Sequence, residues 1–410
     1  MTRTGIGSAS TRRFALFGLA LLIWALALIA IAVTVIPDAY WFSYYSVDYS
    51  LGFVRRGLAG ELVGLFPEDH YFRALRFLRW LPTAFFVIGL AVLAWAVAST
   101  SGRSERRLMM ALLVPLLPFG FAFGLFSARP DLFGASALIG FAVALNSVHK
   151  SRSVLIASAV YGIAAAVLTL THEAIPFLFG LGALSALAVL ARQHHANTLR
   201  ASAILAVGPG LLTALAVAVL GRRGISGQLC ELVPHGATNH PLAGNPSVGE
   251  LLRGFRFDVD YHDWVCRNIT PLYDQSFGDA TQFVASIGVV GLAASTALGI
   301  TLLSVTVLAV SHVSGVPFGR MWAILRARTS WVLFGIALFL PVFMTGVDWT
   351  RWWVMIAFDI GIVFLLFASS GPEADMPPTR RTLTVFAIGA ALLAALPLGI
   401  IPGFGAPVPM

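Results

Sequence analysis

Residues 14–36 read FALFGLALLIWALALIAIAVTVI, an apolar run without a single charged side chain. A helix needs roughly 20 apolar residues to cross the hydrocarbon core of a bilayer, so this run predicts a membrane span. It is longer than the apolar region of a secretory signal peptide, and no small-residue cleavage motif follows it. We therefore interpret it as a retained first span.

The composition of the whole chain agrees with a membrane protein. Of its 410 residues, 58% are hydrophobic and 11% are charged, whereas soluble domains carry about 25% charged residues. The net charge of +8 comes mostly from arginines at the ends of apolar runs, and no basic tract interleaved with aromatics is present. This pattern excludes a nucleic-acid partner and leaves membrane lipids as the surroundings.

Ten further apolar runs follow the first one. We predict an all-α, polytopic transmembrane bundle of about 11 spans, forming a single domain over residues 1–410. The predicted spans are 14–36, 81–100, 108–126, 132–148, 154–171, 174–191, 201–220, 284–311, 330–346, 353–369 and 383–402.

The positive charges predict the orientation of these spans. With the N-terminus in the cytoplasm and the C-terminus outside, the short outer connections hold only Arg129 and Arg351, and all other basic residues of the short connections lie on the inner side. Those inner residues are Arg103, Arg106, Arg107, Lys150, Arg152, Arg192, Arg200, Arg320, Arg326, Arg328, Arg380 and Arg381. Lys150 is the only lysine, which suggests a GC-rich bacterial genome and hence the bacterial inner membrane.

Two predicted extracytoplasmic segments are longer than simple connections. Residues 37–80 contain the short amphipathic stretches 58–66 and 71–80, which we expect to lie in the membrane interface. Residues 221–283 hold both cysteines, Cys230 and Cys266. Outside the cytoplasm such a pair most simply forms a disulfide, which would close this loop; neither cysteine belongs to a CxxC motif, so we assign no metal site.

The first polar cluster lies in the stretch DYSLGFVRRGL, residues 48–58. Arg55 and Arg56 are suited to bind phosphate oxygens in a two-pronged manner, and Asp48 is suited to take a proton from an attacking hydroxyl. The alternative is an interfacial helix whose arginines touch lipid phosphates. We interpret the nearby Trp41, Tyr44 and Tyr45 as membrane-belt aromatics.

Three more clusters lie beside short outer connections. His172 and Glu173 form a titratable pair at a hairpin, where helix capping is the alternative. Asp348 and Arg351 are spaced for a local i,i+3 salt bridge. Arg129 and Asp131, which flank Pro130, form either part of a site or a turn with its own salt bridge.

Two other acidic features occur in the sequence. Asp359 is the one carboxylate inside a predicted span, and we expect it to face the bundle. The run DVDYHD at residues 258–263 is acidic enough to hold a divalent cation, but it lacks a recognised ligand spacing. We interpret it as a solvated stretch and assign no cofactor with certainty.

An acid shortly after the first span, in a long outer loop with amphipathic segments, resembles the GT-C superfamily of membrane glycosyltransferases. The phrases GFVRRGL, His172-Glu173 before a proline, and Asp348 three residues before Arg351-Trp352 also resemble membrane proteins found among bacterial surface-polysaccharide genes. The resemblance implies sugar transfer from a polyprenyl-phosphate carrier to a glycan or lipid acceptor, usually with inversion, in cell-envelope polysaccharide synthesis.

The leading hypothesis is thus a single displacement. Asp48 would deprotonate the acceptor while Arg55 and Arg56 stabilise the departing phosphate. His172 and Glu173 are further catalytic candidates, and Arg129, Asp131, Asp348 and Arg351 would bind substrate.

Two other functions are open from the sequence. One is an O-antigen or polysaccharide polymerase or ligase, which would carry its main catalytic loop late in the chain, as residues 221–283 would here. The other is a transporter of lipid-linked sugars, which would need more polar groups at mid-depth than Asp359 alone.

The orientation gives a direct prediction. Single cysteines placed at Ile225 or Asn245 in a Cys230→Ser/Cys266→Ser background should react with an impermeant maleimide added outside the cell. Labelling of either position only from the cytoplasmic side would refute the predicted orientation.

Overall fold

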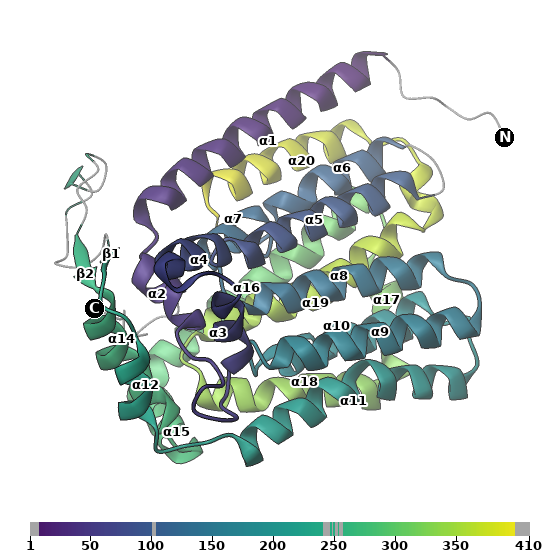
Figure 1. Ribbon diagram of the computed structural model, residues 1–410. Coiled ribbons are helices and arrows are strands. Elements are labelled where there is room, and N and C mark those ends of the chain that lie inside the picture. Colours follow the sequence, from purple (N-terminus) through teal and green to yellow (C-terminus); the bar gives the residue numbers. More distant parts are fainter. Residues whose placement is uncertain are drawn as a thin grey trace.

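A computed structural model describes residues 8–100, 104–240 and 257–397, together with positions 247, 249, 250 and 253. Apart from two short strands, its regular elements are helices, and Figure 1 shows that the long helices lie side by side in one bundle. The structure confirms the predicted fold class, an all-α polytopic helix bundle.

Seven helical segments of the described chain are long and apolar enough to cross a membrane. The bent pair α17 (Phe318–Arg326) and α18 (Thr329–Thr345), with 98° between its helices, brings the number to eight if it forms one span. The seven are α1 (Ser8–Val35), α4 (Tyr71–Leu78) with α5 (Leu81–Ser99), α6 (Glu105–Leu113) with α7 (Phe121–Phe126), α9 (Ser151–Thr169), α11 (Ala196–Leu220), α16 (Gly288–Ser314) and α19 (Trp349–Ser369).

The remaining predicted spans coincide with shorter helices. These are α8 (Asp131–Ser147), α10 (Ile175–Leu190) and α20 (Arg380–Ala395); residues 398–402 of the last predicted span lie outside the described residues. The structure thus supports seven or eight spans by length and composition, and the count of eleven stays a prediction. Apolar runs do not fix the count by themselves, because a short helix buried by its neighbours is as hydrophobic as one that crosses lipid.

The centre of the bundle is formed by α10 and α19. Both are buried on nearly every face, whereas α11 and α16 expose many large apolar side chains, including Leu212 and Leu308. Such exposed apolar surface is what a lipid environment requires. α10 packs against α8, α11, α18 and α19, so it fixes the mutual position of helices from both halves of the chain.

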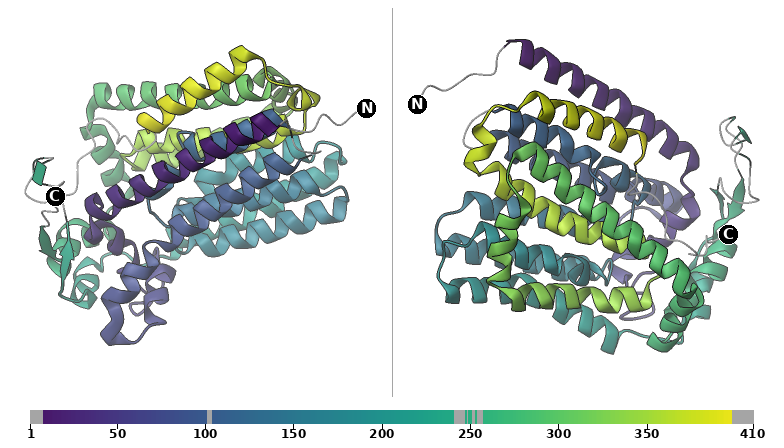
Figure 2. Two further views of the ribbon diagram at one scale, coloured as in Figure 1. Left: turned by 90° about the horizontal axis from the view of Figure 1, so that it is seen from above. Right: turned by 180° about the vertical axis from the view of Figure 1, so that it is seen from behind.

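Both long loops predicted from the sequence lie at the same end of the bundle, which we call the loop end (Figures 1 and 2). Residues 37–80 supply α2 (Asp38–Phe42), α3 (Gly57–Gly64) and α4. Residues 221–283 supply α12 (Ser226–Leu232), α14 (Tyr261–Asn268), α15 (Phe277–Ser286), and the antiparallel strands β1 (Ala237–Asn239) and β2 (Asp258–Asp260), which pair Ala237 with Asp260. A disulfide joins Cys230 of α12 to Cys266 of α14.

At the opposite end of the bundle, two arginines of α6 bind the C-terminal ends of α16 and α19. Arg106 donates to the carbonyl of Val313 at the C-terminal end of α16, and Arg107 donates to that of Ser369 at the C-terminal end of α19. Arg107 also pairs with Asp375. The last carbonyls of a helix lack partners within the helix and carry the negative end of its dipole, so buried arginines are well matched there.

Glycine at position 60 lets α3 approach the preceding turn. A Cβ atom at Gly60 would lie 2.1 Å from the carbonyl oxygen of Val47, a backbone atom that cannot swing away. Gly64, one turn later on the same helix, has nothing within 4 Å of a Cβ atom. The close contact therefore fixes α3, and with it the arginines that immediately precede α3.

We expect Gly60→Ala to destabilise the protein by about 1–3 kcal/mol, the usual cost of overpacking. Gly64→Ala is the matched control and should be neutral or slightly stabilising, because alanine favours the helix. Thermal unfolding of the detergent-solubilised variants, followed by tryptophan fluorescence, measures both. Equal unfolding temperatures for the two variants would contradict the packing argument.

Candidate functional site at the loop end

Oppositely charged side chains from four separate segments meet at the loop end. We call this set the arginine–carboxylate cluster; it consists of Arg55, Arg56, Arg129, Asp131, Glu173, Asp348 and Arg351. Each of these residues is a candidate from the sequence, and the fold brings them together from the first outer loop, the start of α8, the α9–α10 hairpin and the start of α19.

The deeper layer of the cluster is a crossed pair of salt bridges. Arg351 makes two hydrogen bonds to Asp131, of 2.7 and 2.8 Å, and a third of 2.7 Å to the hydroxyl of Ser127. Arg129 pairs with Asp348 at 3.1 Å. The local pairs that the sequence left open, Arg129 with Asp131 and Asp348 with Arg351, are thus replaced by pairs between α8 and α19, whose N-terminal ends are held together.

Aromatic side chains of the first loop cover this layer. The Arg129 guanidinium lies 5.6 Å from the ring centre of Tyr40 and 5.9 Å from that of Trp41. Trp41, Tyr44 and Tyr45 are all buried, so the interpretation as lipid-facing belt aromatics is wrong. Cations over aromatic faces are stabilised by the ring quadrupole, and that attraction strengthens when water is excluded.

The outer layer of the cluster is centred on Glu173. Arg56 holds this carboxylate with two hydrogen bonds of 2.8 Å, and a guanidinium nitrogen of Arg55 lies 3.9 Å from it. Arg56 is the one non-glycine residue of the described chain with positive φ, at 62°. The pair of arginines lowers the pKa of Glu173 well below its usual range despite burial, which alone would raise it.

His172 packs beneath the outer layer as a neutral imidazole. It is buried and stacks on Tyr44 with ring centres 6.0 Å apart, while its Nδ1 accepts a hydrogen bond of 3.4 Å from the backbone N–H of Ala174. Burial, helped by the charge of Arg56, lowers the pKa of His172 to about 4. The imidazole is therefore uncharged at neutral pH.

Arg55 differs from its neighbour because its charge is only partly compensated. It lies 4.7 Å from the ring centre of Tyr273 and donates to the carbonyl oxygen of Leu272, while its Nε has no hydrogen-bond partner among the described residues. Sequence reasoning missed Tyr273, as well as Tyr40 and Ser127. Nothing in the local pattern marks them, because their partners are distant in the chain.

Asp48 makes none of these contacts. Its carboxylate accepts hydrogen bonds from the backbone N–H and the hydroxyl of Ser50, and it has no ion-pair partner in the described chain. The side chain is partly exposed. It lies beside α3 because Gly60 packs against the backbone of Val47 and Asp48.

The cluster carries an excess of positive charge. Four arginines face three carboxylates, and the N-terminal ends of α8, α10 and α19 all lie beside them. Helix N-termini attract anions through their unpaired N–H groups and their dipoles. The arrangement is therefore suited to a substrate that carries a negative charge.

Asp359 lies deeper than the cluster and faces the bundle, as expected from the sequence. It is fully buried, and its Oδ2 accepts a hydrogen bond of 2.8 Å from the backbone N–H of Gly182. No hydrogen bond or ion pair joins it to the cluster among the described residues, so it belongs to the core of the bundle.

Comparisons with known proteins give a family without a stated activity. Residues 14–394 match the model of a family described as "Uncharacterised membrane protein Rv1490". The proteins named Rv1490 in Mycobacterium tuberculosis H37Rv and Mb1527 in Mycobacterium bovis, both described as uncharacterized, are each 40% identical over 384 residues, which is 92% of this chain and 88% of theirs. No solved structure matches the chain.

The buried imidazole predicts a pH dependence of stability. In the unfolded chain His172 takes up a proton near pH 6.5, whereas in the folded protein it does so only near pH 4. The unfolded state therefore binds more protons between these values, so stability should be complete above about pH 6.5 and decline as the pH falls toward 4, by up to about 3 kcal/mol.

Thermal unfolding of wild type and His172→Gln between pH 4 and 7.5 tests this expectation. The variant should lose part of the acid sensitivity, and His195→Gln, at an exposed histidine, should keep all of it. Parallel pH profiles for wild type and His172→Gln would show that His172 is not responsible.

Proposed function

This chain belongs to the family of the membrane protein Rv1490, and we propose that it is a GT-C-like glycosyltransferase. It would transfer a sugar from a polyprenyl-phosphate donor to a glycan or lipid acceptor on the extracytoplasmic side of the bacterial inner membrane. The loop end would face that side, because the basic residues of most short connections lie at the other end of the bundle.

The observation that carries the proposal is the uneven neutralisation of two adjacent arginines. Arg56 is fully paired with Glu173, whereas Arg55 keeps an Nε without a hydrogen-bond partner and lies at the rim beside Tyr273. A polyprenyl-phosphate sugar is a phosphodiester with one negative charge, which matches the excess of one arginine over the carboxylates of the cluster. Arg55 would therefore bind the phosphate.

Asp48 would act as the general base. Its carboxylate is partly exposed and free of ion pairs, whereas Glu173 is held by Arg56 and its lowered pKa makes it a poor proton acceptor. Asp48 would remove the proton of the acceptor hydroxyl as its oxygen attacks the anomeric carbon. The bond from that carbon to the phosphate oxygen breaks, and polyprenyl phosphate leaves with the bonding electrons and an added negative charge, which Arg55 stabilises.

The other members of the cluster would position these groups. The Glu173–Arg56 pair fixes the backbone turn from which Arg55 projects, and Arg129 with Asp348 would contact the donor sugar or the acceptor. Neutral His172 and Tyr44 would form an uncharged wall beneath them.

A polymerase or ligase remains the second candidate, and one contact favours it. Leu272 and Tyr273, both in the segment 221–283, touch Arg55, so the late loop of the chain takes part in the same site. In that case the catalytic groups would come from the late loop, and Asp48 would be dispensable.

The roles of Asp48 and Arg55 should separate in mutants. Asp48→Asn keeps the size of the side chain but cannot accept the proton, so turnover should fall by roughly 10²–10⁴-fold while phosphate binding is kept. Arg55→Ala should weaken phosphate binding as well as turnover, and Arg55→Lys should restore binding only in part, because lysine lacks the planar fork.

Purified protein in vesicles, supplied with a panel of polyprenyl-phosphate sugars, gives turnover as released polyprenyl phosphate. Farnesyl phosphate serves as the binding probe.

Two variants control for nonspecific effects at the loop end. Asp69→Asn and Arg76→Ala change an exposed acid and an exposed arginine of the same loop, and both should behave as wild type. A well-folded Asp48→Asn protein with near-normal turnover would reject Asp48 as the base. It would favour the polymerase or ligase candidate if variants at Leu272 or Tyr273 were inactive.

A further inference from the structure

A second group of ligand-type side chains lies on the loop end, outside the arginine–carboxylate cluster. We call it the histidine–aspartate cluster; it consists of His235, Asp260, His262 and Asp263. One potential ligand atom from each residue lies within 4.8 Å of the others. His235 and Asp263 are mostly exposed, so an ion could enter from solvent.

The local fold builds this cluster from three elements. His235 follows α12, Asp260 ends β2 and caps α14 by accepting from the backbone N–H of Asp263, and His262 lies in the first turn of α14. The pairing of Ala237 with Asp260 across the two strands brings His235 next to Asp260. No recognised ligand spacing marks this cluster in the sequence, because His235 lies 25 residues before Asp260.

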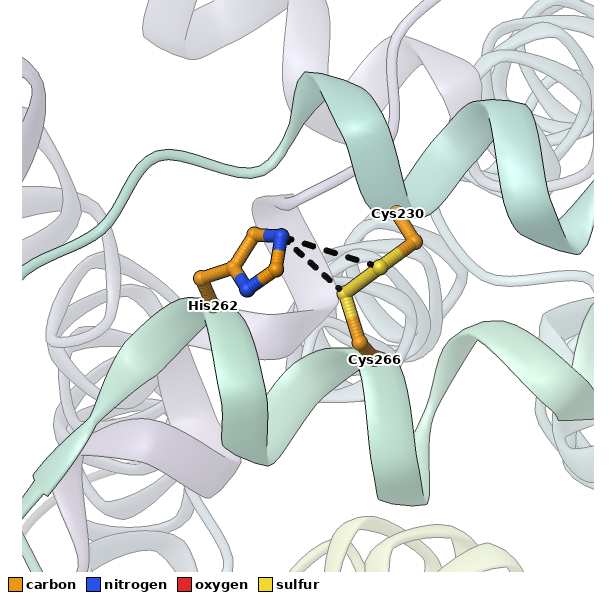
Figure 3. Close-up of side chains that lie close together, drawn as sticks. All are labelled: Cys230, His262 and Cys266. Atoms are coloured by element: carbon orange, nitrogen blue, oxygen red, sulfur yellow. Dashed lines mark hydrogen bonds between the residues drawn. A yellow bond between two sulfur atoms is a disulfide. The ribbon is translucent and has the colours of Figure 1, made fainter.

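The disulfide fixes one of the imidazoles. Figure 3 shows His262 facing the bond between Cys230 and Cys266, with its Nε2 3.7 Å from each sulfur. Cys266 follows His262 by one helical turn, so the disulfide anchors the same face of α14 to α12. With Nε2 directed at the sulfurs, Nδ1 is the nitrogen that faces the aspartates.

The distances inside the cluster suit a small transition-metal ion. His235 Nδ1 lies 3.1 Å from Asp260 Oδ1, and His262 Nδ1 lies 3.0 Å from Asp263 Oδ1. The two imidazole rings stack with their centres 4.0 Å apart and 25° between their planes. Because a metal binds an imidazole nitrogen in the plane of the ring, the exposed His235 would turn its ring to direct Nδ1 at the same ion. Zinc binds nitrogen and oxygen ligands at about 2.0–2.2 Å, so neighbouring ligands in a tetrahedral site are about 3.3–3.5 Å apart. Each histidine–aspartate pair is already close to that separation.

We propose that the histidine–aspartate cluster binds one divalent transition-metal ion of the zinc type. Two imidazoles with two carboxylates favour zinc over calcium or magnesium, which prefer oxygen ligands alone. The ion would join the end of α12, the end of β2 and the start of α14, and so stiffen the segment that also carries Tyr273. The proposal is independent of the glycosyl-transfer function.

Metal titration of the full chain tests the site. Protein purified in detergent without reductant, stripped with a chelator and alkylated to exclude free thiols, is titrated with ZnCl₂ by calorimetry, with MgCl₂ and CaCl₂ in parallel. Wild type should bind one Zn²⁺ per chain and show no saturable Mg²⁺ or Ca²⁺ binding at this site. His235→Ala and Asp260→Asn should each weaken Zn²⁺ binding at least 10-fold; His235 is exposed and asparagine is also a good helix cap, so neither change should unfold the loop.

His70→Ala provides the matched control. His70 and Asp69 form a pair on the same end of the molecule, 3.3 Å apart, and neither belongs to a group of three or more ligand-type side chains among the described residues. This variant should bind Zn²⁺ like wild type. Absence of stoichiometric Zn²⁺ binding to wild type, or equal affinity in wild type and His235→Ala, would overturn the proposal, as would loss of binding in His70→Ala alone.

Discussion

The loop end depends on the buried ion pair between Arg351 and Asp131. Both side chains are almost fully removed from solvent, with 4% and 0% exposed, so neither charge could stay in place without the other. Two hydrogen bonds between them and a third to Ser127 satisfy the guanidinium. Loss of one partner of such a pair usually costs about 3–5 kcal/mol, because an uncompensated charge remains buried. The pair therefore holds the starts of α8 and α19 in register, and the crossing bridge from Arg129 to Asp348 doubles that link.

The ratio of arginines to carboxylates differs between the deeper and the outer layer of the arginine–carboxylate cluster. The two deeper salt bridges each join one arginine to one carboxylate, whereas the outer layer has two arginines for one carboxylate. Of the two outer arginines, Arg55 is the one whose Nε has no hydrogen-bond partner among the described residues. A neutral His172 and buried aromatic rings separate the two layers. The proposed phosphate site rests on this difference between the two layers. The difference leaves one positive charge at the rim, held by a rigid lower layer, where a phosphate could be bound before reaction and stabilised as it leaves.

Much of this arrangement was predictable from the sequence, because charged residues next to apolar runs are costly and few. The helical bundle and the identity of every member of the arginine–carboxylate cluster follow from that constraint. The sequence could not predict which charged residues form salt bridges with one another. The i,i+3 spacing favours a bridge between Asp348 and Arg351, but Arg351 binds Asp131, which is more than 200 residues away in the chain. Aromatic residues beside a span usually face the membrane interface, but Trp41 and Tyr44 pack over the arginines instead. Ligand spacing in the sequence could not identify His235 as part of the histidine–aspartate cluster, because the pairing of β1 with β2 brings it to Asp260.

A structure of the protein bound to farnesyl phosphate, determined by electron cryo-microscopy in a lipid nanodisc, would locate the phosphate site. We expect the phosphate within hydrogen-bonding distance of the Arg55 guanidinium, beside Tyr273 at the loop end. A phosphate bound instead in the apolar groove near His312 and Phe386, between α6, α16 and α20, with Arg55 left unchanged, would contradict it.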